Sequence, residues 1–170
     1  MTNPGPPSSA TPSGLSVPDQ SPLTRFLRGL RRNRGSALYF ARCNTHALRA
    51  ALIETVQQKL GEPVAVVHIT DDLDLLVDVQ IRRVLADDPA PVVFVLDLEK
   101  RLSQPYKADQ YFVFQEINMR RGPICLVERS LIFCLPDFAL NILARETPDF
   151  FDWRSGLYEF ESIEALRSDC

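Results

Sequence analysis

The sequence has no long apolar run and few of the residues from which metal and redox sites are built. No stretch approaches the roughly 18 apolar residues of a membrane-spanning helix, and residues 1–22 lack the basic start and apolar run of an export signal. There are only two histidines and four cysteines, and the spacing of Cys43, Cys125, Cys134 and Cys170 fits neither a zinc site nor a CxxC redox pair. We therefore expect a cytoplasmic protein with reduced thiols, no metal site and no membrane partner.

The chain is also short of net charge, at −3 for pH 7, so it has no overall attraction for nucleic acids or anionic membranes. Residues 1–22 contain six prolines and several serines and threonines, and such a segment cannot bury enough apolar surface to offset the entropy of ordering. We expect a disordered tail over residues 1–22. Residues 23–170, which are long enough for a hydrophobic core, are expected to form a single domain.

Apolar, β-branched segments alternate with segments of helical periodicity from Ser36 onward. Strands are predicted at 36–43, 63–70, 91–98, 131–135 and 157–160. Helices are predicted from Pro22 and at 45–60, 72–86, 108–121, 136–145 and 162–167. This alternation is typical of a three-layer α/β fold, with a mostly parallel five-stranded sheet between two layers of helices. Ligands of such sheets bind at the carboxyl ends of the strands, so the residues after each strand are the candidates for a site.

The connection after the first predicted strand lacks what a phosphate-binding loop needs. Such a loop uses glycines to let backbone amides surround the phosphates, a lysine for the β- and γ-phosphates, and a serine or threonine for magnesium. Residues 41–46 read Ala-Arg-Cys-Asn-Thr-His, with neither glycine nor lysine. We therefore expect no nucleotide hydrolysis and no catalytic residues here. The start of the next helix, near Asn44, leaves weak anion binding open.

Two further features carry possible binding chemistry. The third strand ends in Asp97, with Glu99 after it; four apolar residues followed by Asp match a magnesium-holding Walker B strand. Many buried strands also end in a capping Asp, and without a phosphate-binding loop the structural role is favoured for Asp97. Arginines crowd the first helix. Acidic residues outnumber basic ones later in the chain, so we interpret this cluster as a solvated basic face and expect no nucleic-acid partner. The cluster consists of Arg25, Arg28, Arg31, Arg32 and Arg34.

The C-terminal half carries more specific motifs. Residues 117–121 read INMRR, residues 131–145 read LIFCLPDFALNILAR, and residues 147–160 read TPDFFDWRSGLYEF. This series resembles the nucleotide-binding-like domain of bacterial STAND-type proteins, which often carry tetratricopeptide repeats after it. The resemblance covers roughly residues 35–160 and is clearer after residue 110. It implies a P-loop NTPase-like fold similar to that of AAA-type ATPases.

The resemblance also implies roles for individual residues. Asp97 would match the Walker B acid, and Arg121 and Arg154 would sense or contact a nucleotide or a neighbouring molecule; with Glu99, these are the candidate cofactor-binding residues. The Walker A residues are absent, and we expect no tetratricopeptide repeats in this chain. Structural roles are the alternative. Asn118 and Arg121 would tie a helix to a strand end, Asp149 would pair with Arg154, and Pro148 and Trp153 would close the core.

Together these observations predict a non-catalytic, NTPase-like module that binds a partner protein in a bacterial signalling or defence system. No cofactor is expected. The alternative is a nucleotide-binding switch or weak NTPase that uses an atypical site with magnesium. The identity of the partner, the pathway and the oligomeric state stay open.

Overall fold

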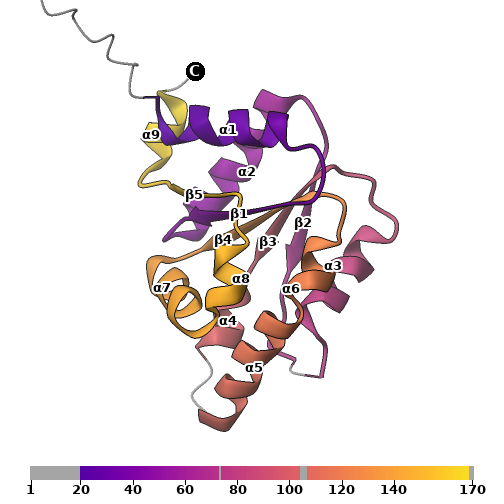
Figure 1. Ribbon diagram of the computed structural model, residues 1–170. Coiled ribbons are helices and arrows are strands. Elements are labelled where there is room, and N and C mark those ends of the chain that lie inside the picture. The colour runs from indigo at the N-terminus through magenta and orange to yellow at the C-terminus, as the bar shows by residue number, and fades with distance from the viewer. Residues whose placement is uncertain (1–19, 73, 104–106, 169–170) are drawn as a thin grey trace, which may run out of the picture.

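A computed structural model describes residues 20–72, 74–103 and 107–168, with side chains described throughout except at 107–111. Nearly all of the tail predicted to be disordered, residues 1–19, lies outside the described residues. Five parallel strands form one sheet in the order β2-β3-β4-β1-β5 (Figure 1). The strands are β1 Ala37–Arg42, β2 Val64–His68, β3 Val92–Leu96, β4 Ser130–Leu135 and β5 Gly156–Glu159. The predicted alternation and five-stranded sheet are confirmed, and every strand pair is parallel.

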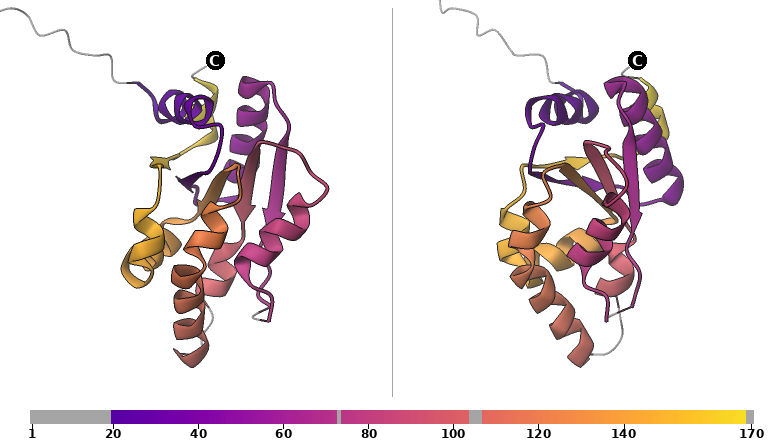
Figure 2. Two further views of the ribbon diagram at one scale, coloured as in Figure 1. Left: turned by 45° about the vertical axis from the view of Figure 1, so that its right-hand side comes forward. Right: turned by 90° about the vertical axis from the view of Figure 1, so that its right-hand side faces the viewer.

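The strand order explains how the helices divide between the two faces of the sheet. The connection from β1 to β2 runs toward one edge, and the later connections run toward the other. Because crossovers between parallel strands are right-handed, opposite directions place helices on opposite faces. One layer contains α1 Pro22–Arg32, α2 His46–Leu60 and α9 Ile163–Arg167. The other contains α3 Val77–Leu85, α4 Leu98–Leu102, α5 Lys107–Met119, α6 Arg121–Cys125, α7 Asp137–Glu146 and α8 Pro148–Asp152 (Figure 2).

Alternate residues of each central strand supply the two cores. In β1, Leu38 and Phe40 pack toward the layer of α3 to α8, whereas Tyr39 and Ala41 pack toward α1 and α2. All five residues of β3 are buried, as expected for a strand covered on both faces. This double burial is why the strands are continuously apolar in the sequence.

The helix ends show both confirmed and wrong predictions. The helix predicted at 45–60 is confirmed as α2; Thr45 caps it by accepting a hydrogen bond from the Leu48 amide, and Gly61 ends it in the left-handed conformation. The helix predicted at 72–86 begins only at Val77. The Gln80 side chain accepts a hydrogen bond from the Thr70 amide and donates one to the Leu75 carbonyl. These bonds hold the preceding segment in a non-helical turn.

Three five-residue helices, α4, α6 and α8, are not expected from the sequence. Leu98, predicted as the end of a strand, is the first residue of α4, because the chain turns sharply at Asp97. α6 precedes the amino end of β4, and α8 precedes the amino end of β5. No helix in the described part of the chain has the length and apolar character to cross a membrane.

Candidate functional site

The strand order changes direction between β1 and β4, and the crevice between their carboxyl ends is the usual ligand position in such sheets. In this protein the crevice is crossed by hydrogen bonds between groups of the protein itself. The Cys43 amide donates to the Leu135 carbonyl at 2.9 Å, and the Asp137 amide at the start of α7 donates to Asn44 Oδ1 at 2.8 Å. Asn44 thus occupies an amide that an anion would otherwise contact.

Charged groups at this edge are also paired with one another. Arg42 lies 3.5 Å from Asp137 and 3.3 Å from Glu159. Arg49, on the first turns of α2, is only 4% exposed; its Nη1 lies 2.5 Å from Glu99 Oε1, and its Nε donates to the Cys43 carbonyl. The guanidinium groups of Arg42 and Arg49, which lie on either side of the α2 N-terminus in the sequence, are therefore already held by carboxylates.

Asp97 is the most unusual residue at this edge. Its φ of 68° is the only positive φ among described residues other than glycine. The carboxylate is buried, with Oδ2 2.7 Å from Nδ1 of His68 and Oδ1 3.4 Å from Nζ of Lys100. Burial by itself raises the pKa of Asp97, but the hydrogen bond with His68 and the charge of Lys100 outweigh it, so the pKa is lowered. Asp97 is thus a carboxylate held between two exposed basic side chains.

Other buried groups lie at the same edge. Burial and the neighbouring Cys43 thiol raise the pKa of Cys134 well above its usual value, which favours the thiol over the thiolate. Cys43 is buried whereas His46, three residues later, is exposed. Glu99 Oε2 is a buried oxygen without a hydrogen-bond partner among the described residues. No group of three or more potential metal ligands occurs among those residues either.

The four sequence-predicted site residues fall into two separate pairs. Asp97 and Glu99 lie at the carboxyl edge, whereas Arg121 begins α6 ahead of β4 and Arg154 lies just before the amino end of β5. Because all strands are parallel, the carboxyl ends and the amino ends of the strands lie at opposite ends of the sheet. The predicted binding residues therefore do not converge on one ligand.

The contacts of the arginine pair differ from the predicted structural ones. Arg121, not Arg154, pairs with Asp149, at 3.5 Å, and its guanidinium lies 5.8 Å from the Trp153 ring centroid. Arg154 stacks 4.3 Å from the centroid of the Phe151 ring and pairs with Asp152. The predicted Asp149–Arg154 pair is wrong because α8 turns these residues toward different neighbours.

Asn118 acts as a tie, as one interpretation expected, but between helices. Its Oδ1 accepts a hydrogen bond from the Phe150 amide, which joins α5 to α8. Pro148 and Trp153 do not close the core; Pro148 is exposed and Trp153 is 52% exposed. Phe150, for which the sequence predicted no role, is fully buried against Phe40 and Phe133.

Comparison with known protein families and with curated proteins found no match. The structure itself shows an α/β fold with a five-stranded parallel sheet.

The exposed Trp153 lines a hollow at the amino end of β1, which we call the amino-edge groove. It has a volume of about 540 Å³. On its rim, Leu126 is 74% exposed and Trp153 52% exposed. It is lined by Ser36, Ala37, Leu38, Gly122, Cys125, Leu126, Trp153 and Ser155.

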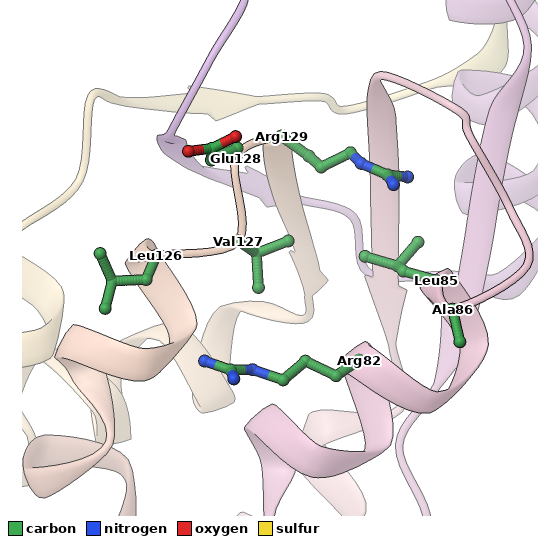
Figure 3. Close-up of a pocket in the computed structure, with 7 residues that line it drawn as sticks. All are labelled: Arg82, Leu85, Ala86, Leu126, Val127, Glu128 and Arg129. Atoms are coloured by element: carbon green, nitrogen blue, oxygen red, sulfur yellow. The ribbon is translucent and has the colours of Figure 1, made fainter.

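A second hollow, of about 550 Å³, shares Leu126 with the amino-edge groove and is shown in Figure 3. Leu85 of α3 and Val127 face each other across it, with Arg82 and Arg129 at its sides. Arg82 donates to the Pro123 carbonyl, and Arg129 donates to the carbonyls of Asp88 and Ala90. These bonds hold both guanidinium groups against the body of the protein. Sequence analysis missed this surface because α6 is too short to show a helical period.

Proposed function

We propose that this chain is a non-catalytic, NTPase-like module that binds a partner protein at the amino-edge groove. The carrying observation is the exposure of Leu126 and Trp153 on the rim of an apolar hollow. Contiguous exposed apolar surface marks interaction sites. Tryptophan and arginine dominate the energetics of protein interfaces, and Arg121 lies against the exposed Trp153. The expected occupant is a partner segment that inserts an apolar side chain beside Trp153.

The carboxyl edge supports the non-catalytic part of the proposal. The connection at residues 41–46 has neither glycine nor lysine, Asn44 holds the start of α7, and Arg49 is buried against Glu99. A triphosphate at this position would have to displace ion pairs that the protein makes with itself. Breaking a buried pair leaves an uncompensated charge, so such displacement is unfavourable.

The resemblance of the C-terminal motifs to STAND-type domains supports a role in bacterial signalling or defence. In that setting the domain would act through the protein it binds. The motifs also contribute directly to the proposed surface, because Trp153 and Arg121 both belong to them.

The test is site-specific photo-crosslinking in cells of the native host. A photo-reactive amino acid in place of Leu126 should crosslink one discrete partner, and Trp153→Ala should abolish the product. The matched control places the same group at Phe138, which is 50% exposed on α7, outside the groove. Equal crosslinking from both positions contradicts the proposal. Magnesium-dependent ATP turnover that Asp97→Asn abolishes would also overturn it.

A second candidate function is a nucleotide-binding switch, which the geometry of Asp97 favours. Strained backbone at a buried, charged residue is commonly retained for function. Under this alternative, magnesium with ATP, ADP, GTP or GDP should raise the unfolding temperature, and Asp97→Asn should remove the shift. An unchanged melting temperature with all four nucleotides would exclude this function and leave the protein-binding proposal intact.

A further inference from the structure

The first helix carries a concentration of positive charge that the proposed function does not use. No Asp or Glu occurs between Asp19 and Glu54, whereas seven arginines do. Two of the seven, Arg42 and Arg49, pair with carboxylates at the carboxyl edge. The other five are exposed on α1 and the residues just after it; they are Arg25, Arg28, Arg31, Arg32 and Arg34.

Three of these arginines form a continuous stripe, which we call the arginine face. Arg25, Arg28 and Arg32 are spaced i, i+3 and i+7 and so share one side of α1, over about 10 Å of helix axis. None of the three has a carboxylate partner in the described part of the chain. Arg25 only approaches the Tyr158 ring, at 5.9 Å from its centroid. The arginine face is thus open for an anionic ligand.

The other two arginines are held in place. Arg31 Nη2 donates to the Lys59 carbonyl at the end of α2, and Arg34 pairs with Glu62. These contacts fix the C-terminal end of α1 against α2. The arginine face is consequently carried on a rigid element, and ordering it on binding costs little.

The burial of α1 restricts which polyanion fits. Its apolar residues Leu23, Phe26 and Leu30 are each at most 3% exposed, so the helix cannot insert an apolar side into a bilayer. The exposed side has no apolar anchor, which a protein interface needs for affinity. It has no aromatic side chain on which unpaired bases could stack.

Contact with a phosphate backbone requires none of these features. Arginine binds phosphate through paired N–H groups, and release of condensed counterions drives the association without apolar burial. Contrary to the expectation from the acidic balance of the chain as a whole, we propose that the arginine face of α1 binds the phosphate backbone of double-helical DNA without reading its sequence. The surface is distinct from the amino-edge groove, so each proposal can fail alone.

The experiment measures the binding of full-length protein to a fluorescent 20-base-pair duplex by anisotropy between 50 and 200 mM salt. Three phosphate contacts predict a slope of about −2.7 for log K against log salt, hence an affinity loss of about 40-fold over this range. Arg28→Gln with Arg32→Gln should reduce the slope by about 2. The matched control, Arg83→Gln with Arg145→Gln, removes the same charge from exposed positions on α3 and α7 and should leave the slope unchanged.

Both substituted pairs lie at exposed side chains, so each variant should unfold at the temperature of the parent protein. Absence of duplex binding at 50 mM salt would overturn the proposal, as would an equal loss of binding in the control variant. Tighter binding through these arginines to poly-glutamate, to anionic vesicles, to single-stranded DNA of equal charge or to a second copy of the chain would also overturn it. Equal affinity for unrelated duplex sequences is the expected result.

Discussion

Asp97 has a left-handed backbone conformation, with φ at 68°. Apart from glycine, Asn and Asp, residues rarely adopt it. The conformation turns the chain directly from β3 into α4 and points the carboxylate at His68. Its backbone geometry and its contact are therefore linked, and substitutions at this position separate them.

We expect the order of stability at this position to be Asp97→Asn, then Asp97→Gly, then Asp97→Ala. Asparagine tolerates the left-handed conformation and keeps a polar partner for His68. Glycine keeps only the conformation, and alanine keeps neither, at a cost of about 1–3 kcal/mol. Urea unfolding of the three variants checks the order. An alanine variant as stable as the asparagine variant would show that neither the backbone nor the contact matters.

Gly61 adopts almost the same conformation, with φ at 65°, where α2 ends. A Cβ there would meet nothing within 4 Å, so only the backbone opposes a side chain. Gly61→Ala should therefore lower the free energy of unfolding by about 1 kcal/mol. Gly35→Ala is the control, because its Cβ also has open space and its φ is not in the left-handed region. Equal effects of the two substitutions would contradict this explanation.

At the scale of elements, a buried ionic contact joins three helices. Arg101 of α4 is 0% exposed and lies 2.8 Å from Glu116 of α5. Glu116 also accepts a hydrogen bond from the Val77 amide at the start of α3, and Arg101 donates to the Leu75 carbonyl. This contact fixes how α3, α4 and α5 pack below the sheet.

Removing either charge alone should destabilise the protein, and removing Arg101 should do so most. Arg101→Met leaves the Glu116 carboxyl buried without its partner, at a cost of about 3–5 kcal/mol. Glu116→Gln should cost less, because burial already disfavours the charged form of this carboxyl. The double variant should be more stable than the sum of the two losses predicts, because no lone charge remains. Denaturant unfolding of the four proteins gives this coupling energy. Strictly additive losses would mean that the two side chains act independently.

How far the sequence predicts these elements depends on the range of the interactions that form them. The five strands and the long helix α2 were predictable, because continuous apolar runs and local caps such as Thr45 are local signals. The pair of Arg101 and Glu116 was not, because its members lie on different helices. The late start of α3 depends on a side-chain bond from Gln80 and was equally hidden.

The candidate sites show the same division. Asp97 was predicted from its place after an apolar strand, and the structure puts it at the carboxyl edge. Its contact with His68 was missed, because it needs β2 and β3 to be neighbours in register. The amino-edge groove was missed as well, since Leu126 and Trp153 come together only through tertiary packing.

For the whole molecule, two buried carboxyl groups give opposite contributions to the pH dependence of stability. The pKa of Asp97 is lowered from the ordinary 3.8, since the contacts with His68 and Lys100 outweigh burial. Its stabilising effect is present above pH 3.8 and is lost as pH falls through the folded-state pKa. For Glu116, burial outweighs its hydrogen bond with Val77 and its attraction to Arg101, so the pKa is raised from 4.5. Its contribution is present below pH 4.5 and is lost as pH rises through the folded-state pKa.

These signs predict where each substitution changes the pH profile. Asp97→Asn should flatten the loss of stability below about pH 4, because the folded state no longer holds a carboxylate there that the unfolded chain protonates more easily. Glu116→Gln should lower stability at every pH but flatten the decline that begins above about pH 4.5. Urea midpoints measured from pH 2.5 to pH 7 for the parent and both variants give the three profiles. If the Asp97 variant instead altered only the region above pH 4.5, the carboxylate would be destabilised in the folded protein, and the contacts with His68 and Lys100 would not outweigh its burial.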